Sequence, residues 1–89
     1  MKKLVKVEEV EGEGLIGLMG EVVLIFCLNY IYSGKLVGVN TTCIKLENPK
    51  IVYYTGGFDK KSFTTSEKLP NDLYIQTGAI ESFHKTDKS

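Results

Sequence analysis

The chain has 89 residues, and its 11 Lys and Arg residues balance 11 Asp and Glu residues, so the formal net charge is zero. A chain of this length forms one domain, and balanced charge creates no global field that would attract nucleic acid or a membrane. Two cysteines and one histidine are too few for a disulfide framework or an ordinary zinc site, so we expect no metal and no cofactor. Cys27 lies within an apolar run and is expected to be an inert core thiol.

The first twenty residues predict an extended segment followed by a short helix. Residues 3–10 alternate weakly between apolar and charged side chains, which fits a short edge strand and an extended arm equally well. Apolar residues at helical spacing predict a helix over 13–20, and Gly20 suits its left-handed end. Charged residues close to the start argue against a secretory signal, so we expect a cytoplasmic protein.

Three strands joined by short turns are predicted next. The apolar run from Val22 to Leu28 fits a strand buried on both faces or a helix segment, and its brevity favours the strand. Residues 31–39 predict a second strand, whose glycines remove bulk where the sheet bends or another backbone approaches. A third strand begins near Cys43, with Ile44 and Leu46 directed inward. No apolar run approaches the roughly 20 residues that a membrane-spanning helix needs.

A kink and a long polar segment interrupt the remaining strands. Pro49, within residues 47–50, predicts a kink or bulge because proline cannot donate a hydrogen bond to a neighbouring strand. Residues 55–71 lose the alternation and predict a loop or the tip of a long hairpin. Residues 73–76 and 79–83 predict the last two strands, which a sharp turn at Thr77-Gly78 separates.

These elements resemble the Sm-like protein family, which includes the LSm and Hfq types. The first motif, over 21–47, follows a short helix ending in Leu-Met-Gly and contains Gly34-Lys35-Leu36 and Gly38-Val39-Asn40. The second motif, over 72–84, contains the run LYIQTGAIES, and the polar segment is the variable loop between the motifs. The resemblance implies a mostly β fold, in which a short N-terminal helix precedes a strongly bent, five-stranded antiparallel open barrel. A single domain would span residues 1–89.

The resemblance also implies a partner and a binding site. Sm-like proteins pair the fourth strand of one subunit with the fifth of the next, and close into rings of about five to seven subunits. The implied interface residues are Leu73, Tyr74, Ile75, Ala79, Ile80, Ser82 and Phe83. In such rings single-stranded RNA, often uridine-rich, binds at two pore-facing turns. The implied RNA-binding residues are Asn40, Thr41, Thr42, Gln76, Thr77 and Gly78.

The sequence is compatible with two functions. The first is a homo-oligomeric ring that binds RNA as a chaperone or scaffold. The second is a ring-forming protein-interaction or structural module without RNA binding, with residues 55–71 as its contact surface. Zero net charge and the uncharged pore-facing turns favour this function. Phe58 and Phe63 either fix the polar segment on their own subunit or contact a partner. A nucleophile and base cannot be assembled around one histidine, so we expect no enzyme.

Overall fold

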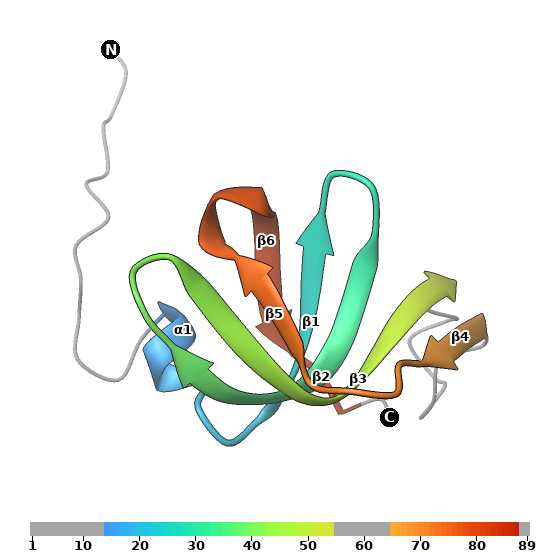
Figure 1. Ribbon diagram of the computed structural model, residues 1–89, viewed down its shortest axis with the longest axis horizontal. Coiled ribbons are helices and arrows are strands. Elements are labelled where there is room, and N and C mark those ends of the chain that lie inside the picture. Colours follow the sequence, from blue (N-terminus) through green and yellow to red (C-terminus); the bar gives the residue numbers. More distant parts are fainter. Residues whose placement is uncertain (1–13, 55–64, 88–89) are drawn as a thin grey trace, which may run out of the picture.

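The computed structural model describes residues 14–54 and 65–87. Over these residues the chain is mostly β, with an antiparallel sheet of six strands, one short α-helix and one 3₁₀ helix (Figure 1). The elements in chain order are α1 (Gly14–Gly17), β1 (Val22–Cys27), β2 (Ile31–Val39), β3 (Cys43–Tyr54), β4 (Thr65–Lys68), β5 (Leu73–Gln76), η1 (Thr77–Ala79) and β6 (Ile80–Lys85). No helix in the described ranges is long and apolar enough to cross a membrane.

The long strand β3 organises the sheet. One edge of β3 pairs with β2, and the other edge pairs with β5 along its first half and with β4 along its second half. The path through the sheet is β4-β3-β2-β1-β6, with β5 beside β3. Figure 1 shows how β3 curves from its pairing with β5 to its pairing with β4. Within the described ranges no pairing joins β5 to β6, so the sheet is not closed.

A β-bulge opposite Gly34 bends β2 and β3. Ser33 pairs with Lys50 and Lys35 pairs with Glu47, so β3 has one more residue than β2 between these two pairs. Asn48 adopts a left-handed φ of 52°, and Pro49 beside it is fully buried. A Cβ on Gly34 would lie 3.0 Å from the Leu46 Cβ and 3.3 Å from the Pro49 Cα, closer than side chains normally pack. The predicted kink near Pro49 and the close backbone approach at a β2 glycine are both confirmed.

The core lies on one side of the curved sheet. Its buried residues are Val23, Ile25, Leu36, Ile44, Leu46 and Ile75. Of the apolar residues at helical spacing, Leu15 and Leu18 pack against this core, whereas Met19 is exposed. Leu24 is buried on the other face of β1 in a smaller cluster with Val52. The unbroken apolar run therefore forms a strand buried on both faces, and the inward positions predicted for Ile44 and Leu46 are confirmed.

The strand β4 is the main departure from the predicted fold. Thr65–Lys68 falls in the segment predicted as a loop or the tip of a long hairpin, and it pairs antiparallel with β3. All four side chains are exposed, so no apolar alternation marks this strand in the sequence. The prediction of five strands is therefore wrong, because the described residues alone form a sheet of six.

The other strands lie close to their predicted positions. β2 and β5 begin and end where the sequence pattern placed them. β1 ends at Cys27, one residue before the predicted end, because the turn begins at Leu28. β6 begins at Ile80 and continues to Lys85, since Ala79 belongs to η1.

The helix is shorter than predicted. α1 covers four residues of the predicted range 13–20, since glycine is a poor helix former and a turn follows α1. Gly20 has a φ of 86°, the left-handed conformation predicted for it. The expectations for residues 3–10 and for the two phenylalanines of the polar segment concern residues outside the described ranges.

Candidate functional site

The turn between β2 and β3 is held by the side chain of Asn40. Its Oδ1 accepts hydrogen bonds from the main-chain N–H groups of Thr42 and Cys43, each at 2.8 Å, and from the Thr42 hydroxyl at 3.0 Å. The main-chain N–H of Asn40 donates to the Cys43 carbonyl at 2.9 Å. The Oδ1 atom is thus engaged within the turn, and the NH₂ group is the part of this side chain that can donate to a ligand.

The second predicted turn is hydrogen-bonded to the first. The main-chain N–H of Thr77 donates to the Thr42 carbonyl at 2.9 Å. The Thr77 hydroxyl lies 3.2 Å from the Thr41 carbonyl and 3.3 Å from the Thr42 carbonyl, and it donates to them. Two segments more than 30 residues apart in the chain therefore form one surface. The structure brings together all the turn residues that the sequence analysis singled out.

The joined turns offer neutral polar groups. The six residues are Asn40, Thr41, Thr42, Gln76, Thr77 and Gly78, of which Thr77 is half-buried and the others are exposed. None of the six carries a charge. A Cβ on Gly78 would meet no atom within 4 Å, so a ligand can approach the main chain there closely. This surface can donate and accept hydrogen bonds, but the six side chains provide neither a cation nor a flat ring.

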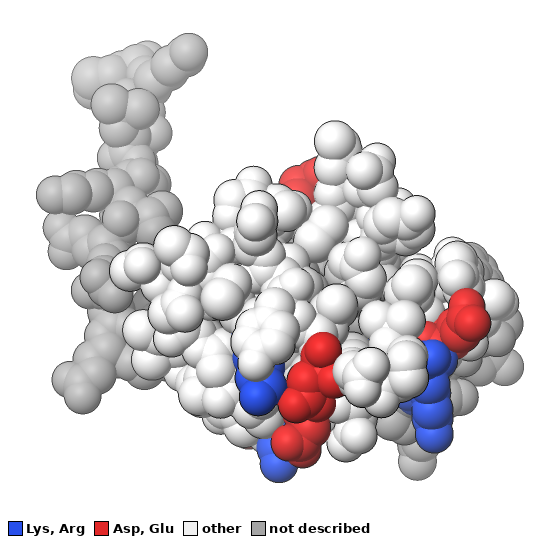
Figure 2. Space-filling view, in the orientation of Figure 1, with Lys and Arg blue, Asp and Glu red and all other residues white. Residues whose placement is uncertain are grey.

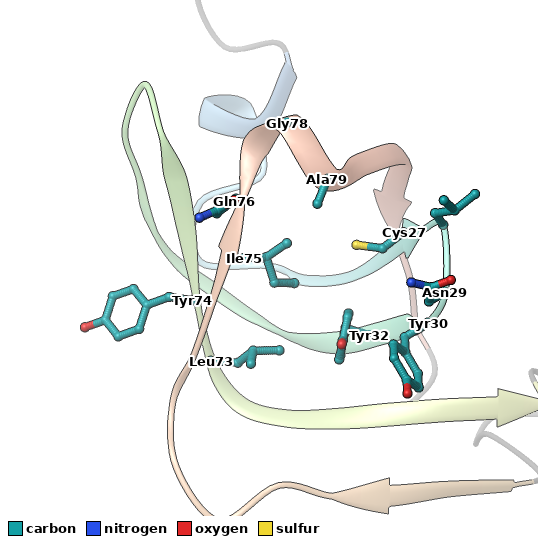
Figure 3. Close-up of a pocket in the computed structure, with 11 residues that line it drawn as sticks. Cys27, Asn29, Tyr30, Tyr32, Leu73, Tyr74, Ile75, Gln76, Gly78 and Ala79 are labelled. Atoms are coloured by element: carbon teal, nitrogen blue, oxygen red, sulfur yellow. The ribbon is translucent and has the colours of Figure 1, made fainter.

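A pocket of about 510 Å³ adjoins the joined turns and contains the flat rings that they lack (Figure 3). It lies between the β1–β2 turn and β5 with η1, and Gln76 and Gly78 belong to its lining as well as to the second turn. The other lining residues are Cys27, Leu28, Asn29, Tyr30, Tyr32, Leu73, Tyr74, Ile75 and Ala79. Every lining residue is uncharged, so the pocket suits a ligand with apolar or neutral polar groups.

Two tyrosines form an aromatic wall of this pocket. The ring centroids of Tyr30 and Tyr32 are 6.1 Å apart, and the ring planes are tilted by 44°. Tyr30 is 53% exposed, whereas Tyr32 is half-buried. Burial raises the pKa of the Tyr32 hydroxyl, with smaller contributions from Cys27 and Tyr30, so this hydroxyl stays protonated at neutral pH. The wall presents flat ring faces together with hydroxyl groups that can donate hydrogen bonds.

Cys27 lies at the base of the β1–β2 turn and lines the pocket. It is half-buried and packs against the main core. Desolvation raises the pKa of its thiol, which keeps it in the less reactive, protonated form. Cys27 is therefore not the fully buried core thiol that was predicted, because it lies half-buried at the edge of the core and borders the cavity.

Charged groups lie on the outer side of β5. The Lys45 Nζ is 5.5 Å from the centre of the Tyr74 ring and 3.6 Å from the Asp72 Oδ2. Hydrogen bonding to Tyr74 raises the pKa of Lys45, with further contributions from Asp72. Figure 3 shows the Tyr74 ring pointing away from the pocket. In Figure 2 most charged side chains gather in the lower half of the view, and the upper half around the β1–β2 turn is almost free of them.

The predicted interface residues divide between the core and the surface. Ile75 is buried, and Leu73, Ile80 and Phe83 are half-buried against the main core. The remaining three, Tyr74, Ala79 and Ser82, are exposed. The four buried or half-buried residues pack within their own subunit, so they can support an interface mainly by holding β5 and β6 in place.

The main-chain groups at the free edge of β5 follow from the strand register. Thr77 donates to Thr42 across the same edge of β3 that pairs with β5. In an antiparallel pair, every second residue directs its N–H and C=O groups toward the neighbouring strand. Since Thr77 does so, Ile75 and Leu73, two and four positions earlier, also direct these groups toward β3. The N–H and C=O groups of Tyr74 and Gln76 therefore face the open side of β5.

The tyrosine pocket was not predicted from the sequence. The pattern predicts a strand over residues 31–39 but gives Tyr30 and Tyr32 no role in binding. The two tyrosines are two positions apart at the start of a strand, and this spacing alone indicates that their rings lie on the same face of the sheet. The spacing does not indicate that β5 and η1 form the opposite wall, or that a cavity lies between the two walls.

Comparisons with known proteins add no family assignment. No protein-family model matches the chain, and no curated protein matches it in sequence. The resemblance to Sm-like proteins therefore rests on the residues of the two motifs.

Proposed function

We propose that the chain is an Sm-like protein that binds single-stranded RNA, with a chaperone or scaffold role in the cytoplasm. In this proposal the bent sheet is an open barrel of the Sm type, preceded by the short helix α1. Copies of the chain assemble into a ring. RNA binds at the surface formed by the two joined turns and the tyrosine pocket, and no chemical step takes place there.

The observation that carries this proposal is the continuity between the turns and the pocket. The 2.9 Å bond from Thr77 to Thr42 joins the turns, and Gln76 and Gly78 of the second turn also belong to the pocket lining. An unstacked base needs a flat partner, and hydrogen-bonding groups to recognise its edge. Tyr30 provides an exposed ring face for stacking, and the main-chain N–H and C=O groups of Gln76 on the open side of β5 can bond to the base edge.

The lack of charge at this surface determines how RNA would bind. Neither the six turn residues nor the pocket lining provides a Lys or Arg to neutralise phosphates. Each subunit should therefore bind weakly, with affinity arising from stacking and from repeated contacts around the ring. The salt dependence should be shallow, because few phosphates are neutralised at this surface.

The free edges of β5 and β6 support the assembly of a ring. An unpaired strand edge invites pairing with another chain, and head-to-tail pairing that closes produces a ring. In the described ranges β5 pairs only with β3, and β6 pairs only with β1. Light scattering should therefore give a mass several times 9.9 kDa, whereas a monomer in dilute buffer would contradict this part of the proposal.

A proline at Tyr74 tests which edge makes the contact. Tyr74→Pro removes an N–H group from the open side of β5, and leaves the bonds of Leu73 and Ile75 to β3 in place. We expect this variant to dissociate while its circular dichroism spectrum stays that of the folded protein. Tyr74→Ala is the matched control, because it removes the 63% exposed side chain but keeps the N–H group. Equal masses for both variants and the parent would show that β5 is not the joining edge.

Substitution of Tyr30 tests RNA binding at the pocket. Filter binding with poly-U and poly-A at low salt should show a weaker complex for Tyr30→Ala, by about 5- to 150-fold, because one stacked base contributes about 1–3 kcal/mol. Tyr53→Ala is the control, since Tyr53 is similarly exposed, at 56%, but lies outside the pocket on β3, where it bonds to Glu67. Equal losses in the two variants would contradict binding at the pocket.

A ring-forming protein-interaction module without RNA binding is the second candidate. The uncharged pocket lining favours it, as does Leu28, which is 84% exposed at the tip of the β1–β2 turn. An exposed apolar residue beside an uncharged pocket gains free energy when a partner protein buries it. The parent protein would then form the oligomer and bind neither poly-U nor poly-A at low salt.

A further inference from the structure

We draw no further inference here: the strongest candidate outside the pocket and the sheet edges, the apolar outer surface of the α1 region where Ile16 and Met19 are exposed, carries nothing because no feature of the described residues shows what covers it.

Discussion

Replacement of Gly34 by alanine should destabilise the protein through the bulge that bends its sheet. The added Cβ would lie 3.0 Å from the Leu46 Cβ, 3.2 Å from the Glu47 carbonyl oxygen and 3.3 Å from the Pro49 Cα. None of these atoms is the end of a flexible side chain, so the backbone of β3 has to shift. Overpacking of this kind costs about 1–3 kcal/mol. The lower entropy of the unfolded alanine chain offsets about 0.4–1 kcal/mol of that cost.

The net loss of about 1–2 kcal/mol corresponds to a fall in Tm of roughly 4–16 °C for a domain of this size. Thermal unfolding of the parent and the variant should be compared at one protein concentration, because assembly makes Tm depend on concentration. Gly38→Ala is the matched control in the same strand, since its Cβ would approach only the Lys45 Cβ, at 3.4 Å. An unchanged Tm for Gly34→Ala, or equal falls for both variants, would refute the close approach at the bulge.

Two further predictions concern the turns. Asn40→Ala should lower the free energy of unfolding, measured in urea, by about 1–2 kcal/mol because three hydrogen bonds to Oδ1 are lost. Asn40→Asp keeps the acceptor oxygen and should lower that free energy less, so equal losses would show that the turn does not depend on this oxygen. In a Cys43→Ser variant, iodoacetamide should alkylate Cys27 with a half-maximal rate at a higher pH than for a free thiol, because burial raises the pKa of this thiol. A half-maximal rate at the pH typical of free thiols would contradict its placement in the pocket.

The strand pattern was predictable wherever burial imposes an alternation of side chains. β2 and β5 were located correctly because turn residues border them and their inward side chains are apolar. β4 was not, because Thr65–Lys68 is stabilised by pairing with β3 and exposes every side chain. Its sequence is that of a polar loop, and tertiary pairing determines its structure.

The candidate site was predictable only in part. The resemblance of the two motifs to Sm-like proteins identified the two turns, and the hydrogen bond from Thr77 to Thr42 joins them. The sequence does not show that the Asn40 oxygen is engaged within its own turn, which leaves the NH₂ group for a ligand. The pocket depends on the distance between the β1–β2 turn and β5, two segments that lie far apart in the chain. The local sequence of Tyr30 contains no information about that distance.

The most direct test of the proposed function is a photo-crosslink between the protein and a short RNA that contains 4-thiouridine. Mass spectrometry of the digested complex would identify the residues that contact the bases. We predict cross-links to Tyr30, Tyr32 or the segment 76–78, where the pocket and the second turn meet. Cross-links confined to Lys60 and Lys61, the adjacent lysines of the polar segment 55–71, would contradict RNA binding at this surface. A parent protein that binds no RNA at low salt would contradict it as well.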